Sequence, residues 1–491
     1  MRTDATRERR RHRQDAHSTD DAPPAPALER AVFWGLMLVV AAAPLPLGSN
    51  RAWAWSGLAL LVGVLLVLWA LAAALRPDVI RVPWRLLWPG AVVFGILVAW
   101  FFIQASGATP ESWHHPLWRM ANDALGLDRP GAISLSPEQT RIGIMRLLAY
   151  AGVFFLTVQS CRLADRARWV FWTVGLATLA YAVYGLFLTF ANINMILWFE
   201  RWSYRGSLTS TFVNRNSFGT YAGLGLVVTL ALMSKALGRS LDMGLSSRSG
   251  VIHFLDNLKP QLFFLVVSFV TIATALLFSK SRGALLATVI GVAAYAAMLG
   301  LRRQFRTRTA IGAALGAVVA CAVLVSFSGS ATLSRFADLA TEGSGRDAVF
   351  ALTTRAIGEH PFLGTGLGSF RGVFQIHRDE AFNVLHPAYQ QAHSSYLEMA
   401  LEAGLPAFAL VLVLVAGPAA FAMRGVLKRR RNLAYPAAGL GATALVAAHS
   451  AVDFSLQIPA VTVTYLAIMG AAVGQSFRSG RGRRSGDEDA P

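Results

Sequence analysis

Long apolar stretches recur along this chain, and they constrain its fold more than any other feature. Many extend for about 18 residues or more, enough for a helix to cross a hydrocarbon core of about 30 Å. Only 15% of the 491 residues are charged, whereas a soluble domain carries about 25%. We therefore expect an all-α polytopic membrane protein with about twelve transmembrane helices. The predicted spans lie at about residues 31–47, 52–75, 86–105, 139–160, 168–191, 213–235, 261–279, 283–301, 309–328, 404–423, 434–453 and 460–477.

The spacing of these spans divides the chain into five predicted segments. One long, partly helical periplasmic loop separates spans nine and ten, and a long ordered loop of this kind is more often functional than not. The segments are a disordered basic cytoplasmic tail at 1–30, transmembrane helices at 31–328, the periplasmic loop domain at 329–394, a periplasmic helix with the last three transmembrane helices at 395–477, and a disordered cytoplasmic tail at 478–491.

The charge pattern predicts the orientation in the membrane. The formal net charge is +18, and this excess of Arg and Lys falls in every second loop, as in "LRRQFRTR" and "MRGVLKRRRN". Cytoplasmic loops are enriched in these residues, so both termini should be cytoplasmic. The same rule explains the basic pI without nucleic acid as a partner.

Arginines on the predicted outer side break this pattern and therefore mark a candidate site. Arg215 lies in "STFVNRNSFGTYAG" and Arg282 in "FSKSRGALLA", each among small polar residues. Several guanidinium groups facing one cavity suit an anionic ligand such as a pyrophosphate. The alternative is that they contact lipid phosphates. The candidate residues are Arg215, Arg282 and Arg346, with Asn214, Asn216 and Arg371 as possible supporting residues.

A histidine precedes a predicted helix in "AHSSYLEMALEAGLP". Ser395 and Glu398 have the spacing of a capping box, which would begin a helix at about Ser395 and leave His393 just ahead of it. The positive end of that helix would favour the neutral imidazole, the form that a general base needs. His393 is thus the candidate catalytic base, with Tyr396 as a possible supporting residue. The alternative is an ordinary hydrogen-bonded role.

Other motifs in this half of the chain are less specific. His377, His386 and His393 have no common metal-ligand spacing, so we expect no metal and no cofactor. The glycine-rich run "HPFLGTGLGSF" predicts a tightly turning loop, and the alternative is that this loop approaches the ligand. Asp453 in "HSAVDFSLQIP" either pairs with an outer arginine or serves as a capping carboxylate, and His449 lies in the span before it.

Taken in order, five motifs resemble the O-antigen ligase and O-antigen polymerase superfamily of bacterial membrane glycosyltransferases. The resemblance covers about residues 205–475, while the first five spans match only as hydrophobic helices. The motifs are "TFVNRNSFGTYAG", "SKSRGALLA", "GRDAVFALTTRAIGEHPFLGTGLGSF", "AHSSYLEMALEAGLP" and "HSAVDFSLQIP".

The resemblance implies a site on the periplasmic face of the bacterial inner membrane. Such proteins transfer a glycan from a polyprenyl pyrophosphate to a sugar hydroxyl, on the lipid A core in ligases and on another lipid-linked unit in polymerases. His393 resembles the family histidine thought to activate the acceptor. Arg215 and Arg282, with Arg346 as a third, resemble the arginines that hold the pyrophosphate. No nucleic acid, metal or cofactor is implied.

Two readings outside this superfamily remain at this point. A lipid-linked oligosaccharide transporter would also have many spans and buried arginines, although it predicts polar residues near the bilayer midplane. A non-catalytic partner in polysaccharide export is the other reading, and it has no use for His393. Ligase and polymerase themselves differ in the acceptor, which the sequence does not reveal.

Overall fold

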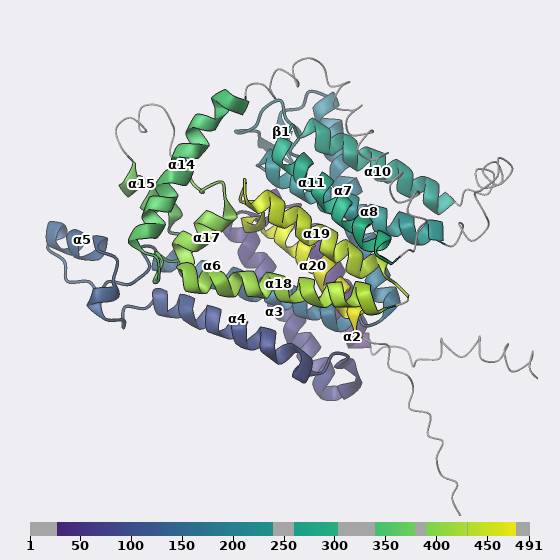
Figure 1. Cartoon of the computed structure of the whole chain (residues 1–491), viewed down its shortest axis with the longest axis horizontal. Helices are drawn as coiled ribbons and strands as arrows, with labels where there is room; N and C mark the ends of the chain where they lie inside the picture. Colours follow the sequence, from purple (N-terminus) through teal and green to yellow (C-terminus); the bar gives the residue numbers. More distant parts are fainter. Residues whose placement is uncertain (1–26, 239–259, 303–338, 379–388, 430, 478–491) are drawn as a thin grey trace, which may run out of the picture.

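The computed structural model describes residues 27–238, 260–302, 339–378, 389–429 and 431–477. Helices make up nearly all of the regular structure in these ranges (Figure 1). The longer helices are α2 (Ala27–Ala42), α3 (Ala52–Leu75), α4 (Trp84–Gln104), α6 (Pro137–Ser160), α7 (Ala164–Phe190), α8 (Arg215–Gly238), α10 (Pro260–Phe278), α11 (Arg282–Gly300), α14 (Leu339–Glu359), α18 (Leu405–Lys428), α19 (Ala434–Ser450) and α20 (Pro459–Ser476). Shorter elements are α5 (Leu117–Leu125), α15 (Phe370–His377), α17 (Ser395–Ala403), β1 (Met195–Ile196), β2 (Phe199–Glu200), and the 3₁₀ turns η1 (Leu47–Ser49), η2 (Pro77–Val79), η3 (Glu111–Trp113) and η5 (Ser455–Gln457).

Eight of the described helices are long and apolar enough to cross a membrane: α3, α4, α6, α7, α8, α10, α11 and α18. This agrees with the expectation of an all-α polytopic membrane protein. Three further predicted spans correspond to α2, α19 and α20, which pack against this set. The span expected at 309–328 lies outside the described residues, so the total of twelve stays a prediction.

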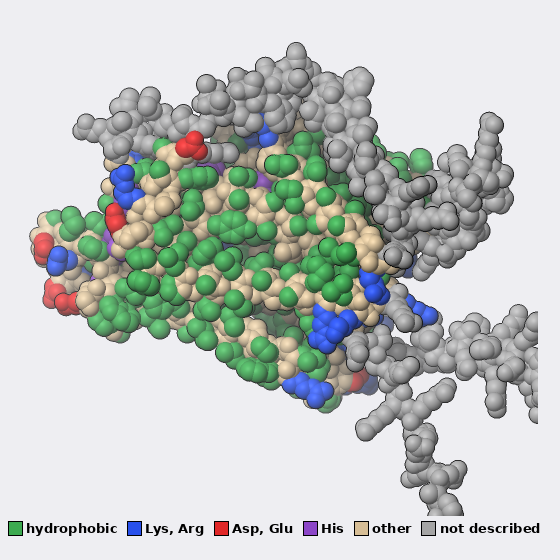
Figure 2. All heavy atoms as spheres, in the orientation of Figure 1, with side chains coloured by type: hydrophobic (Ala, Val, Ile, Leu, Met, Phe, Trp, Pro, Cys, Tyr) green, Lys and Arg blue, Asp and Glu red, His purple; other side chains and the backbone are tan. Residues whose placement is uncertain are grey.

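We call the end of the bundle at which α3, α6, α8 and α11 begin the outer end, because the charge pattern predicts that it faces the periplasm. Figure 2 shows hydrophobic side chains spread broadly over the helices, with the larger Lys and Arg patches of this face toward the opposite, inner end and smaller ones beside Asp and Glu at the outer end. That distribution matches the expected excess of basic residues on the cytoplasmic side.

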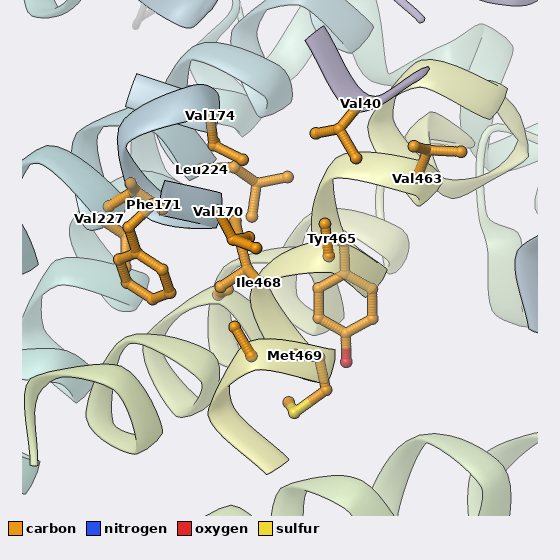
Figure 3. Packing of buried hydrophobic residues seen from close by; sticks show 14 of the residues in the cluster. Val40, Val170, Phe171, Val174, Leu224, Val227, Val463, Tyr465, Ile468 and Met469 are labelled. Carbon is orange, nitrogen blue, oxygen red and sulfur yellow. The ribbon is translucent and has the colours of Figure 1, made fainter. Parts of the chain in front are cut away.

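Helix α20 is the centre of the bundle, since it is buried along almost its full length and packs against α6, α7, α18 and α19. Ile468 and Met469 of α20 point into the same apolar region as Phe171 of α7 (Figure 3). Small residues allow close helix approach here. A Cβ on Gly291 of α11 would lie 2.8 Å from the carbonyl oxygen of Gly441 of α19.

A second, smaller core lies at the outer end. Helices α14, α15 and α17 pack together above the bundle (Figure 1), and they share one cluster of buried side chains. Its members are Val349, Leu352, Ala356, Phe370, Val373, Phe374, Ala392 and Leu401. The predicted loop domain is therefore folded and helical where the structure describes it, and it supports α17 from outside.

The glycine-rich run forms the tight loop that was predicted, with positive φ at Gly364, Gly366 and Gly368. Its amides are engaged by the protein, because Thr365 N donates to Leu401 O at 3.0 Å and Gly366 N donates to Glu402 O at 2.8 Å. These two amides are therefore already engaged within the protein, and an approach of this loop to a ligand stays a prediction. In the chain the loop leads from α14 to α15, and its hydrogen bonds hold it against the carboxyl end of α17.

Candidate active site

Helix α17 places His393 at the outer end of the bundle, but its cap differs from the prediction. The N-cap is Ser394, whose Oγ accepts a hydrogen bond from Leu397 N. Ser395 instead donates through its Oγ to the carbonyl oxygen of Asp453 at 3.0 Å. Glu398 reaches back past the cap and accepts from Ala392 N at 2.7 Å. The capping serine is thus one residue earlier than the sequence spacing indicated.

The backbone at His393 is in the left-handed region, with φ of +53°. This conformation is uncommon for a residue with a side chain and persists where its surroundings enforce it, often at functional sites. Two aromatic rings contact the imidazole edge-to-face, with centroid distances of 5.6 Å to Tyr389 and 5.2 Å to Phe454. The side chain retains 17% exposure, so it is positioned by contacts while one part stays accessible.

Asp453 is the carboxylate that faces His393. Its Oδ1 lies 3.8 Å from His393 Nδ1 and accepts a hydrogen bond from Phe454 N at 2.8 Å. Its Oδ2 lies 4.0 Å from Nε2 of His449, one turn earlier on α19. Asp453 therefore faces two histidines, one just before α17 and one on α19. Its expected pairing with an outer arginine stays a prediction.

His449 connects Asp453 to the helices that carry the arginines. Its Nδ1 lies 2.8 Å from Thr220 Oγ1 of α8 and 3.1 Å from Ser455 Oγ. On α11, a Cβ on Gly283 would lie 3.3 Å from His449 Nε2. Sequence reasoning gave His449 no role, although a histidine four residues before an aspartate at the end of an apolar span was a usable signal.

Arg215 and Arg282 are the first residues of α8 and α11, and a hydrogen bond joins these two helix starts. Ser281, the N-cap of α11, donates from Oγ to Asn216 Oδ1 at 2.8 Å. Asn214 Oδ1 accepts from Asn216 N at 2.8 Å. The predicted asparagines therefore act within the protein by fixing the two helix ends side by side. Both helices direct the positive end of their dipole to this region.

The Arg215 side chain is half-buried and surrounded by neutral groups. Its guanidinium lies 5.5 Å from the centre of the Tyr204 ring and donates through Nη1 to Ser207 Oγ at 3.5 Å. Its Nε is buried and forms no hydrogen bond to any described residue. Since a guanidinium has five N–H donors in a fixed fork, Arg215 retains capacity for an anion. Arg282 is half-buried as well.

The remaining predicted residues are not all brought to this place. Arg371 lies on α15 with an exposed side chain. Arg346 belongs to α14, where the structure does not describe its side chain. Tyr396 donates from its hydroxyl to Ala447 O at 2.8 Å, so it ties α17 to α19 and supports the position of His393 indirectly.

Two buried carboxyl groups on α17 stand behind His393. Glu402 Oε1 accepts from Phe370 N at 3.0 Å, at the start of α15. Burial raises the pKa of Glu402 to about 7, against the lowering effect of Arg146 and the backbone amides. Burial, together with the charge of Glu402, also raises the pKa of Glu398 well above its usual range. These groups fix the ends of α17 and lie inside the protein.

The histidines weighed as metal ligands are separated. His377 pairs with Glu359 at 3.0 Å, and His386 lies outside the described residues. Within the described ranges, no group of three or more His, Cys, Asp or Glu side chains could hold a metal ion. The ring centres of His115 and His360 lie 5.0 Å apart, and burial lowers the pKa of His115 to about 4.

Residues 267–412 match the family model described as O-antigen ligase. The matched segment extends from α10 to the first turns of α18 and so contains Arg282 and His393, whereas Arg215 and Asp453 lie on either side of it. A comparison with curated proteins gives no match. The match confirms, over residues 267–412, the resemblance of this chain to the O-antigen ligase and polymerase superfamily.

Proposed function

We propose that this protein is an O-antigen ligase-like glycosyltransferase. It moves a glycan from polyprenyl pyrophosphate to a sugar hydroxyl of the lipid A core, on the periplasmic face of the bacterial inner membrane. The observation that carries this proposal is the alignment of His393 with the buried carboxylate of Asp453, 3.8 Å away, next to the joined starts of α8 and α11. The family match over residues 267–412 supports the same reaction class.

The proposed chemistry divides between a base and two cations. With Nδ1 of His393 facing Asp453, the neutral tautomer that carries its proton there leaves Nε2 to accept a proton. Nε2 takes the proton of the acceptor hydroxyl, and the hydroxyl oxygen forms a bond to the anomeric carbon. The bond from that carbon to the pyrophosphate oxygen breaks, and its electron pair leaves with the pyrophosphate.

Arg215 and Arg282 stabilise the leaving pyrophosphate in this scheme. Charge develops on the leaving group in the transition state, and preorganised donors aimed at such charge give large rate effects. The positive ends of α8 and α11 act in the same direction. Arg346 stays the candidate for a third contact. One direct displacement inverts the anomeric centre, so NMR of the product should show inversion, and retention would rule this scheme out.

A polymerase of the same superfamily is the second candidate function, because the family match does not distinguish the two acceptors. The two differ in what accumulates in a strain that lacks the gene. Loss of a ligase leaves full-length glycan on the lipid carrier. Loss of a polymerase leaves a single repeat unit on the core. A lipid-linked oligosaccharide transporter is less well supported, since it assigns no role to a base beside a carboxylate.

The deciding experiment measures transfer by the full chain with His393→Ala, in the null strain and with purified protein and lipid-linked donor. The matched control is His377→Ala, a histidine of the same outer domain that pairs with Glu359. With equal amounts in the membrane, we expect transfer to fall about 10²-fold or more for His393→Ala and to persist for His377→Ala. Transfer near the wild-type rate in His393→Ala would overturn the proposal.

A further inference from the structure

An apolar groove lies on the side of the bundle formed by α3, α4 and α6. Its volume is about 330 Å³, within the range of small-molecule sites. Side chains of α3 and α6 line its length, and Phe102 of α4 lines its outer part. Both α3 and α4 pack against α6, so α6 forms the floor and the other two helices form the walls.

One glycine of α3 and one of α6 shape the groove. A Cβ on Gly63 would meet no atom within 4 Å, so the space at this position of the wall is open. Deeper in the bundle the groove closes, because a Cβ on Gly152 of α6 would lie 2.7 Å from Val62 and 2.9 Å from Leu66. The groove therefore runs between α3 and α6 and ends where these two helices come into contact.

One charged side chain lies at the outer end of this groove. Arg141, in the first turns of α6, is the sole charged residue among the described residues that line the groove. It is exposed and donates to Ala105 O at 3.5 Å. Leu148 lies seven residues further along the helix, about 10 Å deeper. A cation at the end of an apolar groove suits a lipid, because the cation can bind an anionic head group while the groove holds a hydrocarbon chain.

The groove and the two arginines approach α17 from different sides. Figure 1 shows α3 and α4 on one side of α17 to α20, with α8 and α11 on the other. Ile144, which lines the groove, also packs in one cluster with Leu367 and Ala403 at the end of α17. Arg146 donates to Gln457 O close to the same helix. Helix α6, which forms the floor of the groove, thus also contacts the helix that follows His393.

We propose that this groove docks one acyl chain of the phosphorylated acceptor lipid, with Arg141 bound to its phosphate. The inference rests on the proposed function, which requires two membrane-anchored substrates to meet at one base. The donor pyrophosphate is assigned to Arg215 and Arg282, so the acceptor must enter from elsewhere in the outer leaflet. Among the described residues, this groove combines an apolar lining with a cation at its outer end, and both features fit such a lipid.

The test uses full-length protein in phosphatidylcholine vesicles that contain a trace of lipid A with a photoactivatable group at the end of one acyl chain. We expect crosslinks to α3 and α6. Gly63→Phe fills the groove and Arg141→Gln removes its charge, and each should lower the crosslink yield about tenfold. Gly57→Phe is the matched control, because Gly57 has equally open surroundings on the same helix but does not line the groove.

Binding is read separately from catalysis. The His393→Ala protein should crosslink like wild type, and the two groove variants should raise the KM for acceptor while leaving the KM for donor unchanged. Crosslinks to wild type without any transfer would disprove the transferase proposal and keep the lipid site. Equal crosslinking by a photoactivatable phosphatidylcholine, or equal yields from Gly63→Phe and Gly57→Phe, would overturn the lipid site.

Discussion

Arginines gather at both ends of this helix bundle, but they meet different partners. At the inner end, Arg81 and Arg166 both form ion pairs with Glu29, whose side chain is 4% exposed. At the outer end, Arg215 meets a serine hydroxyl and the face of a tyrosine ring. The inner carboxylate is matched within the protein, whereas Arg215 is held among neutral groups.

This difference separates a structural use of arginine from a functional one. A buried charge that has its counter-ion in the chain stabilises the folded state only as long as both partners are present. A guanidinium held only by neutral groups carries a desolvation cost that no counter-ion in the protein offsets, so its charge remains available to an anionic ligand. We therefore expect changes at the inner cluster to alter stability and changes at Arg215 to alter turnover.

The largest expected effect on stability is at the inner cluster. Glu29→Ala leaves the buried Arg166 and the half-buried Arg81 without their carboxylate, and we expect a loss of about 3–5 kcal/mol in the free energy of unfolding. Thermal unfolding of the protein in detergent measures this. Glu200→Ala is the control, since its pair with Arg205 is exposed and should contribute about 0.5 kcal/mol or less. Equal losses for the two variants would contradict the comparison.

Arg215→Ala should show the reverse pattern. We expect glycan transfer to fall about 10²- to 10³-fold, the range found when one donor to a developing anion is removed. The thermal midpoint should stay close to that of wild type, because Arg215 has no carboxylate partner among the described residues. Arg371→Ala, at an exposed position of α15, should leave transfer unchanged. A large loss of stability in Arg215→Ala would mean that Arg215 stabilises the fold, as the arginines around Glu29 do.

The helices could be read from the sequence, because a membrane span needs only length and low polarity. The apolar runs predicted α3 at its observed bounds and most other helices within a few residues. The capping of α17 was misplaced by one residue, since adjacent serines at 394 and 395 have similar local signals. Only the fold decides which of them points along the helix and which faces Asp453.

The long-range contacts of the site could not be read in this way. His393 and Asp453 are sixty positions apart, and their approach depends on how α17 packs beside the end of α19. The same holds for the link between Asn216 and Ser281. The sequence could mark each residue as unusual for an apolar environment, but the partner of each follows from tertiary packing.

A smaller effect on turnover is expected at Asp453. Asp453→Asn keeps the shape and removes the charge that faces His393, so we expect transfer to fall about tenfold to a hundredfold. Because the carboxylate favours the protonated imidazole, its removal should also move the acidic limb of the pH–rate profile to lower pH. Asp347→Asn, at an exposed position of α14, is the control. A fall in rate with an unmoved profile would assign Asp453 to structure alone.

The last effect is a dependence of stability on pH, and it concerns the buried carboxyl group of Glu402 behind the site. Burial raises the pKa of Glu402 from the ordinary 4.5, which the unfolded chain keeps, to about 7 in the folded protein, so the folded state should retain the proton to higher pH. Stability should therefore fall as the pH rises through this window, by up to about 1.4 kcal/mol per pH unit. Glu402→Gln removes this contribution, while Glu398, which faces the same region, keeps its own. Thermal midpoints between these pH values measure the change in slope, with Glu138→Gln at an exposed position of α6 as control. An unchanged slope in Glu402→Gln would mean that Glu402 is ionised in the folded protein and balanced by Arg146, so that it would be, like Glu29, a buried carboxylate matched by arginine.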